Sequence, residues 1–253
     1  MTTKTGHVYG LHAVASLLAR RPAEVTALTV AEGAGDRRLS DLLEAAGAAG
    51  IAVRRVARKE LDKRFPAVRH QGVVATVAAA TPELSEKGLA DFLAALAEPA
   101  FLLVLDGVQD PHNLGACLRT ADAAGVHAVI LPRDRASGIT PVVHKVACGA
   151  VESVPVCFVT NLARTLRQLR EAGIWIYGAS DAAGQLLYDT DLRGPVALVL
   201  GGEGKGLRRL TRELCDYLVA IPMAGQVESL NVSVAAGVLL YEARRQRNQE
   251  GQT

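Results

Sequence analysis

Residues 101–125 read FLLVLDGVQDPHNLGACLRTADAAG, an apolar run followed by a polar turn and then by a helical pattern. The run Phe101–Leu105 has the length and composition of a buried strand, and apolar residues recur at helical spacing between Asn113 and Ala124. Ligands of α/β proteins bind at such strand-to-helix turns. The stretch therefore predicts a strand, a ligand-binding turn and a helix whose buried side includes Leu114.

The same alternation of strands and helices continues toward the C-terminus. We expect strands at 128–131, 154–159, 174–179, 196–200 and 218–221, and helices at 141–150, 162–172, 208–217 and 233–244. The strands are continuously apolar, which is typical of a parallel sheet that helices cover on both faces. The predicted fold class is therefore α/β with a parallel sheet.

The N-terminal part predicts a second, smaller α/β unit. Its expected helices lie at 8–18, 39–49 and 58–64, and its expected strands at 25–30, 51–56 and 72–77. The stretch 78–87 contains Pro82 and small polar residues, which are typical of a linker, and a short helix is expected at 89–97. We therefore divide the chain into a first domain (1–78), a linker (79–98), a second domain (99–247) and a polar tail (248–253). The last polar residues, 246–253, are expected to fray.

Composition excludes several classes of protein. The chain has 253 residues, of which 49% are hydrophobic and 21% charged, as in globular domains. No apolar run approaches the roughly 20 residues of a membrane-spanning helix, and the polar N-terminus lacks a signal-peptide core, so we expect a cytoplasmic protein with no membrane partner. The isolated cysteines favour buried reduced thiols over disulfides or a metal site. They are Cys117, Cys148, Cys157 and Cys215.

Charge is unevenly distributed along the chain. Residues 1–80 hold 12 Lys and Arg against 7 Asp and Glu, whereas residues 81–253 hold 16 against 19. The basic side chains concentrate between Arg54 and Arg69. Such a basic segment indicates either a partner that carries phosphates or an ordinary solvated surface, and composition leaves both open.

A glycine-rich segment, LVLGGEGKGL, occupies residues 198–207 after a predicted strand. Four glycines in this position indicate a sharp turn or a close approach of backbone to a neighbour. The segment is no phosphate loop, because Lys205 is followed by Gly206 rather than by Ser or Thr, and its spacing also fails the dinucleotide fingerprint. Because Glu203 would repel phosphate, the loop favours a ligand that is neutral or cationic at that point.

A third segment, IPMAGQVESLNVSVAAGVLLY, covers residues 221–241. Ser229 and Asn231 precede its apolar helix, so they are either helix caps or site residues. The same two interpretations hold for Asn113. Arg119 lies off the buried side of its helix, which suits either a cleft or a surface ion pair.

Together, in this order, the three segments resemble the signature motifs of the TrmH family in the SPOUT superfamily of RNA ribose 2′-O-methyltransferases. The resemblance covers residues 101–245. It rests on N-x-G-x-x-x-R-T-A from Asn113, G-x-E-G from Gly201, and the IPM and SLNVSVA runs that begin at Ile221 and Ser229. The N-terminal part resembles the L30e-like substrate-binding domain of the ribosomal RNA branch, through VYGLHAV at 8–14 and HQGV at 70–73.

The resemblance implies a fold and an activity. The fold is a SPOUT-type parallel sheet with a C-terminal deep trefoil knot, preceded by the L30e-like domain. The activity is methyl transfer from S-adenosyl-L-methionine to the 2′-hydroxyl of a guanosine in 23S ribosomal RNA, in the P-loop of the peptidyl-transferase centre, by a homodimer without a metal. The implied cofactor contacts are Leu200, Gly201, Gly202, Ile221, Met223, Ser229 and Leu230. The implied catalytic residues are Asn113, Arg119, Glu203, Ser229 and Asn231.

Chemistry constrains the roles that these residues can have. A ribose hydroxyl is a poor nucleophile, so the site must position it and stabilise the developing alkoxide. Arg119 is the key residue by resemblance, and because guanidinium stays protonated we expect it to stabilise negative charge rather than to accept a proton. Asn113 and Asn231 would orient the hydroxyl or Arg119, Glu203 would hold Arg119 through a bidentate pair, and Ser229 would bind ribose or phosphate.

Three alternatives remain from the sequence. One is a related methyltransferase that acts on transfer RNA or protects its own ribosome, although the N-terminal domain favours ribosomal RNA. A second is a non-catalytic RNA-binding protein with the same fold, against which the five intact polar residues argue. A third is a nucleotide-binding Rossmann enzyme, which the spacing of the glycine loop disfavours.

Overall fold

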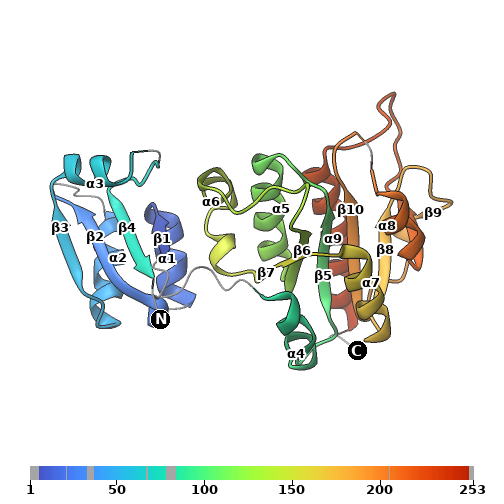
Figure 1. Cartoon of the computed structure of the whole chain (residues 1–253), viewed down its shortest axis with the longest axis horizontal. Coiled ribbons are helices and arrows are strands. Elements are labelled where there is room, and N and C mark those ends of the chain that lie inside the picture. Colours follow the sequence, from blue (N-terminus) through green and yellow to red (C-terminus); the bar gives the residue numbers. More distant parts are fainter. Residues whose placement is uncertain are drawn as a thin grey trace. The chain divides into compact units, whose positions relative to one another are not determined.

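The computed structural model describes residues 6–20, 22–32, 37–66, 68–77, 84–204 and 206–250. Most of the expected linker sequence at 78–87, the end of the expected tail and Lys205 lie outside the described residues. The chain forms two compact units (Figure 1). Unit 1 consists of Met1–Pro82 with Cys148–Ser153, and unit 2 of Glu83–Ala147 with Val154–Thr253.

Unit 1 contains a mixed four-stranded sheet with the order β1-β4-β2-β3. Strand β4 is antiparallel to β1 and β2, while β2 and β3 are parallel. The apolar sides of α1 and α2 pack on one face of this sheet, and Leu61 of α3 packs on the other. The elements are β1 (Gly6–Tyr9), α1 (Leu11–Arg20), η1 (Pro22–Glu24), β2 (Val25–Ala31), α2 (Arg37–Ala48), β3 (Val53–Val56), α3 (Arg58–Arg64) and β4 (Val73–Val77).

The expected helix at 8–18 is wrong at its start, because Val8 and Tyr9 belong to strand β1. Val8 packs in the core under α1, while Tyr9 lies on the opposite face, which is strand alternation rather than helical periodicity. Gly10, with φ +89°, ends the strand, and the backbone N–H of Leu11 donates to Gln71 Oε1 at 3.3 Å as the helix begins.

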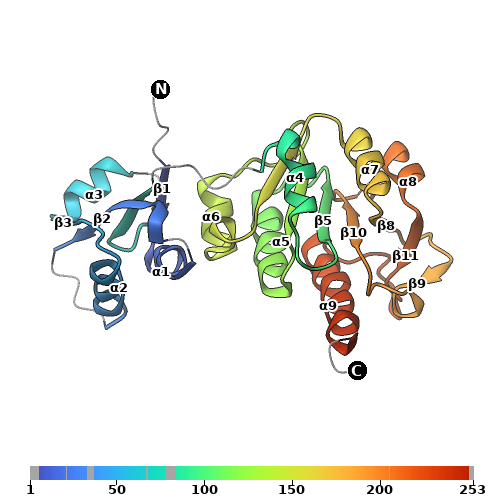
Figure 2. The same cartoon turned by 90° about the horizontal axis from the view of Figure 1, so that it is seen from below.

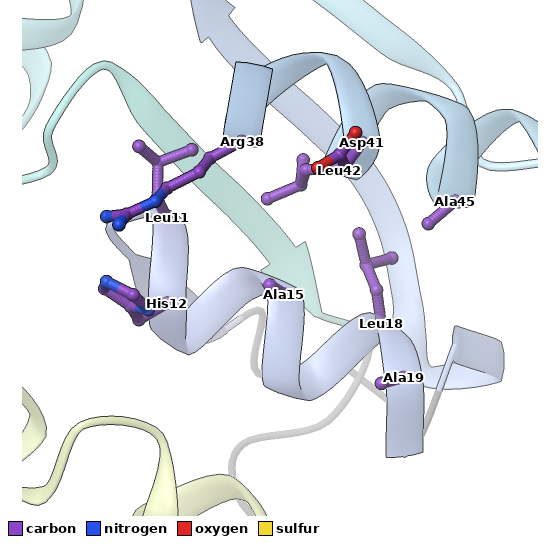
Figure 3. Close-up of a pocket in the computed structure, with 9 residues that line it drawn as sticks. All are labelled: Leu11, His12, Ala15, Leu18, Ala19, Arg38, Asp41, Leu42 and Ala45. Carbon is purple, nitrogen blue, oxygen red and sulfur yellow. The ribbon is translucent and has the colours of Figure 1, made fainter. Parts of the chain in front are cut away.

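A groove of about 380 Å³ lies between α1 and α2 (Figure 3). Leucine and alanine side chains line most of it, and Figure 3 shows His12, Arg38 and Asp41 as its polar members. Asp41 and Arg38 are its two charged members, and the leucine and alanine side chains make the groove mainly apolar.

Unit 2 contains a seven-stranded sheet with the order β7-β6-β5-β10-β8-β11-β9, in which every pairing is parallel. This confirms the predicted parallel α/β sheet. The strands are β5 (Phe101–Asp106), β6 (Ala128–Pro132), β7 (Val156–Val159), β8 (Trp175–Ala179), β9 (Gln185–Leu186), β10 (Val196–Gly201) and β11 (Tyr217–Ala220). The two-residue strand β9 was not expected.

Helices cover both faces of this sheet, with α5, α6 and α9 on one side and α4, α7 and α8 on the other (Figure 2). Strand β5, which lies between β6 and β10, is buried along its whole length. The helices are α4 (Leu89–Ala94), α5 (Pro111–Ala124), α6 (Pro141–Ala147), α7 (Leu162–Glu171), α8 (Arg209–Leu214) and α9 (Val232–Glu250), with short 3-10 turns η2 (Glu86–Gly88), η3 (Ala150–Glu152) and η4 (Leu187–Asp189).

The expectation of a frayed end from residue 246 is wrong for the described residues, because α9 continues to Glu250. Gln246 is buried: its Oε1 accepts from the backbone N–H of Leu192 at 2.8 Å, and its Nε2 donates to the carbonyl of Thr190 at 2.9 Å. Sequence polarity suggested a solvated end, but here the polar side chain satisfies buried backbone groups.

The cysteines form no disulfide, as expected. Cys117 and Cys157 are buried, whereas Cys148 is exposed, so the prediction of buried thiols is wrong for Cys148.

No helix in the described part of the chain is long and apolar enough to span a membrane.

Candidate active site

The site begins where the connections of the parallel sheet diverge. Strands β5 and β10 are neighbours, with Leu105 opposite Leu200 and Asp106 opposite Gly201. The chain leaves β5 through α5 toward β6 on one side, and leaves β10 through α8 toward β11 on the other. In parallel α/β sheets, ligands bind where connections diverge at the carboxyl ends of two strands, and we call this edge of β5 and β10 the crevice.

Asp106, the last residue of β5, connects the first turn to the glycine loop. Its side chain is fully buried, and its Oδ2 accepts from the backbone N–H of Arg208 at 3.1 Å. Its Oδ1 lies 3.4 Å from Arg208 Nε, and its carbonyl accepts from the backbone N–H of Gly202 at 3.0 Å. Asp106 was not among the predicted site residues, although an acidic side chain at a strand end directly before Gly107 was a usable signal.

The glycine loop is packed so closely that side chains cannot be accommodated at two of its positions. A Cβ on Gly201 would lie 1.9 Å from the carbonyl carbon of Gly206, and one on Gly202 would lie 2.4 Å from the carbonyl oxygen of Gly107. Gly206 has φ +60° and pairs with Gly202 through an isolated bridge. The predicted close approach is confirmed, and the groups approached are backbone atoms of the same site.

Asn113 does not cap its helix. Asp110 is the N-cap of α5, because its Oδ1 accepts from the backbone N–H of His112 at 2.9 Å, and Pro111 begins the first turn. The side chain of Asn113 therefore points to other segments: its Nδ2 donates to Glu203 Oε1, and its Oδ1 accepts from Asn231 Nδ2 at 3.1 Å.

Asn231 both caps a helix and belongs to the site. Its Oδ1 accepts from the backbone N–H of Ser233 at 2.9 Å and from Ser233 Oγ at 2.7 Å, which caps α9. Its Nδ2 donates to Asn113. One chain of hydrogen bonds thus joins the glycine loop, the start of α5 and the start of α9, through Glu203, Asn113 and Asn231.

The remaining predicted residues surround this chain of hydrogen bonds. Arg119 is exposed on α5, six residues beyond Asn113, which is about 9 Å along the helix axis. Ser229 is exposed in the segment that leads to Asn231, and Leu230 is partly buried there. The expected pair of Glu203 with Arg119 stays a prediction; the Glu203 carboxylate accepts a hydrogen bond from Asn113.

The segment 221–230, which connects β11 to α9, provides backbone polar groups. Among the described residues, no backbone–backbone hydrogen bond involves residues 221–230. Ile221 and Met223 are partly buried, whereas Val227 is 65% exposed. Backbone N–H and C=O groups need partners when water is excluded, so this segment can bind a ligand through its main chain.

Two thiols near the site, those of Cys117 and Cys215, have raised pKa values that disfavour the reactive thiolate. Burial, and then the charge of Glu203, raise the pKa of Cys117 to about 12, and burial raises that of Cys215 also to about 12. The thiolate is the reactive form of cysteine, so neither residue supports covalent catalysis. In the described part of the chain, no group of three or more His, Cys, Asp or Glu side chains could hold a metal ion.

Family models match both parts of the chain. Residues 100–241 match the SpoU rRNA Methylase family, and residues 7–83 match a model described as RNA 2'-O ribose methyltransferase substrate binding. The chain is 54% identical over 240 residues to the 23S rRNA (guanosine-2'-O-)-methyltransferase RlmB of Shewanella oneidensis, covering 95% of this chain and 97% of that protein. It is 52% identical over 241 residues to the Escherichia coli protein of the same name, covering 95% and 98%.

Solved structures are also similar over nearly the whole chain. The SpoU methyltransferase AviRb from Streptomyces viridochromogenes in complex with AdoMet has a TM-score of 0.76 at 25% identity, covering 97% of this chain and 91% of that chain. The AdoMet-bound rRNA methyltransferase from Sinorhizobium meliloti has a TM-score of 0.75 at 26% identity, covering 96% and 88%.

Proposed function

Because this chain belongs to the SpoU rRNA methylase family, we propose that it transfers a methyl group from S-adenosylmethionine to the 2′-hydroxyl of a guanosine in 23S ribosomal RNA. The observation that carries the proposal is the hydrogen-bond chain through Glu203, Asn113 and Asn231. It brings together one residue from each of the three segments that resemble the family motifs. The modified nucleotide lies in the P-loop of the peptidyl-transferase centre.

S-adenosylmethionine fits the crevice on two grounds. The segment 221–230 has backbone donors and acceptors that no other described backbone group engages, and these suit an adenine held by main-chain contacts. Glu203 at the glycine loop is compatible with a sulfonium cation and unfavourable for a phosphate. The backbone of Leu200, Gly201 and Gly202, together with Ile221, Met223, Ser229 and Leu230, would form the contacts.

The chain's own residues position the nucleophile and stabilise charge. In the reaction the 2′-oxygen bonds to the methyl carbon as the carbon–sulfur bond breaks, and the hydroxyl proton is released. Arg119 stabilises the negative charge that develops on the oxygen, because a guanidinium ion cannot accept that proton. Asn113 and Asn231 fix the geometry of the motif segments around the reacting groups, and Ser229 binds the ribose or its phosphate.

Two features of the proposal concern assembly and topology. The active form is a homodimer, which is supported by two large hydrophobic side chains on one side of α9: Val234 and Tyr241 are 51% and 53% exposed and lie two helical turns apart. The C-terminal part of unit 2 forms a trefoil knot, as the resemblance to the family implies.

The test combines methyl transfer with cofactor binding. Purified protein is incubated with S-adenosylmethionine and with 23S ribosomal RNA that lacks 2′-O-methylation, and the mark is mapped by primer extension, with transfer RNA as the control substrate. We expect Arg119→Ala to lower turnover about 100-fold or more while calorimetry shows little change in cofactor affinity. Near-normal turnover in Arg119→Ala, or a mark on transfer RNA alone, contradicts the proposal.

A further inference from the structure

The net positive charge of the N-terminal region is confined to one segment. Residues 53–69 hold seven Lys and Arg against two acidic residues, whereas the rest of the first 80 residues hold five of each. Both acidic residues already have partners within unit 1: Arg54 Nη2 lies 3.4 Å from Glu60 Oε1, and His70 Nε2 lies 3.1 Å from Asp62 Oδ1. The remaining cations of this segment therefore project an unbalanced positive potential.

Helix α3 presents these cations to solvent. Leu61 is buried against the sheet, whereas Arg58, Lys59 and Lys63 are exposed to solvent. Among the described residues, none of these three forms an ion pair. Cations that are not already paired can bind phosphates without first losing a carboxylate partner.

Three aromatic rings lie beside the end of α3. His7 and Tyr9 of β1 lie on the same face of the sheet as α3, because Val8 between them packs on the opposite face. The Phe65 ring centroid is 5.2 Å from that of His7 and 5.4 Å from that of Tyr9, both at 70°. All three rings are partly exposed.

The guanidinium of Arg64 links the rings to the cations. Its central carbon lies 5.5 Å from the centroid of the Phe65 ring. Burial, and then the charge of Arg64, lower the pKa of His7, which favours the uncharged form of its ring. Through Arg64 the rings adjoin the exposed cations of α3, and we call these residues together the α3 face: Arg58, Lys63, Arg64, His7, Tyr9 and Phe65.

We propose that the α3 face binds an unpaired segment of the RNA substrate, with the cations on successive phosphates and the rings stacked against bases. Stacking on protein rings requires bases that are free of a duplex, and aromatic side chains flanked by Lys and Arg are the usual means of binding single strands. This inference rests on the proposed function for the identity of the RNA. It adds which surface of unit 1 recognises that RNA, and by what chemistry.

The groove between α1 and α2 offers a contrast on the opposite face of the same sheet (Figure 3). Its lining is mainly leucine and alanine, and its charged members are one guanidinium, Arg38, and one carboxylate, Asp41. A mainly apolar lining in which these two charges offset each other attracts a phosphate backbone less than an excess of cations does. The groove therefore supplies a control position, Arg38, for a charge change away from the α3 face.

The experiment measures the affinity of the full chain for protein-free 23S ribosomal RNA at several salt concentrations. The double variant Arg58→Gln with Lys63→Gln should weaken binding about 10-fold or more and reduce the salt slope by roughly 1 to 2. The double variant Tyr9→Leu with Phe65→Leu, which keeps apolar volume, should weaken binding about 5-fold or more with an unchanged salt slope. Arg38→Gln should change the affinity less than about 2-fold.

Several outcomes overturn the inference. One is RNA affinity that stays unchanged in the Arg58 and Lys63 double variant; these side chains are exposed, so misfolding does not complicate their result. Another is a loss of RNA affinity in Arg38→Gln that is as large as the loss in that double variant. A third is competition by duplex RNA as effective as by a single strand of equal length.

Cofactor calorimetry separates this inference from the proposed function. All variants should bind S-adenosylmethionine as the unchanged protein does, because none of the substituted residues lies in the crevice. If the unchanged protein neither binds the cofactor nor methylates RNA, the proposed function fails. The RNA affinities of the variants still decide whether the α3 face binds RNA.

Discussion

The crevice of unit 2 and the α3 face of unit 1 are built in opposite ways. In the crevice, contacts run through backbone and short polar groups, such as the close approach of Gly201 to Gly206 and the bonds from buried Asp106 to the glycine loop. On the α3 face, long side chains such as Lys63 extend from a short helix into solvent. The comparison indicates that the crevice depends on fixed backbone positions, whereas the α3 face depends on summed charge and ring area and should tolerate single substitutions.

The largest expected effect is that of Gly201→Ala. The new methyl group would overlap the backbone of Gly206, which cannot move without displacing the loop, so we expect a loss of about 3 kcal/mol or more in the free energy of unfolding, together with loss of methyl transfer. Urea unfolding and a methylation assay measure both. Gly138→Ala is the control, since nothing lies within 4 Å of its added carbon. Equal stability of the two variants would contradict the close packing of the crevice.

Asp106→Ala is expected to have the next largest effect. It leaves the backbone N–H of Arg208 without its acceptor and loosens the glycine loop, so we expect a loss of about 2 kcal/mol in stability and weaker cofactor binding. Asp106→Asn keeps an oxygen for that N–H and should lose less. Thermal unfolding and calorimetry provide the readouts. If the asparagine variant lost as much stability as the alanine variant, the charge of Asp106 rather than its hydrogen bond would hold the loop.

Asn113→Asp should have a smaller effect that depends on pH. The new carboxylate would lie next to the carboxylate of Glu203 and would lose the amide donor, so we expect a loss of about 1 kcal/mol at pH 7 that diminishes as the pH falls and the carboxylates take up protons. Asn113→Ala removes the same hydrogen bonds without adding charge. The stability lost in Asn113→Ala should therefore depend less on pH, as urea unfolding at several pH values can measure. Parallel pH profiles of the two variants would contradict the proximity of Asn113 to Glu203.

The smallest effect is expected in unit 1, at His7. Burial lowers its pKa from the ordinary value of 6.5, and the charge of Arg64 lowers it further. The unfolded chain therefore takes up the proton first, so this contribution to stability is complete above pH 6.5 and is lost as the pH falls toward the lowered pKa. Between pH 7.5 and pH 5, the free energy of unfolding should fall less in His7→Phe than in the unchanged protein. We expect the difference to be less than about 1 kcal/mol. An unchanged urea profile would indicate that the imidazole is not shielded from water.

Much of the fold follows from local patterns. The run Phe101–Leu105 was predicted as a buried strand because five consecutive apolar residues before a polar turn suit no solvated element, and β5 is buried throughout. Leu114 is fully buried, as its helical spacing predicted, and so is Leu118 one turn later in the same helix. Strand β1 was missed because its four residues lie directly before a helix with a similar apolar content, and such short runs do not distinguish the two periodicities.

The sequence by itself determined the α/β class, the parallel sheet and the three segments that carry the chemistry, because side-chain periodicity and glycine placement are local properties. Only the tertiary structure decided that β10 pairs with β5, that Asp106 bonds to the glycine loop, and that Asn113 joins Glu203 to Asn231 rather than capping its own helix. The physical reason is that strand pairing uses backbone hydrogen bonds, which any residue can form, and contacts between distant segments depend on how the whole chain packs.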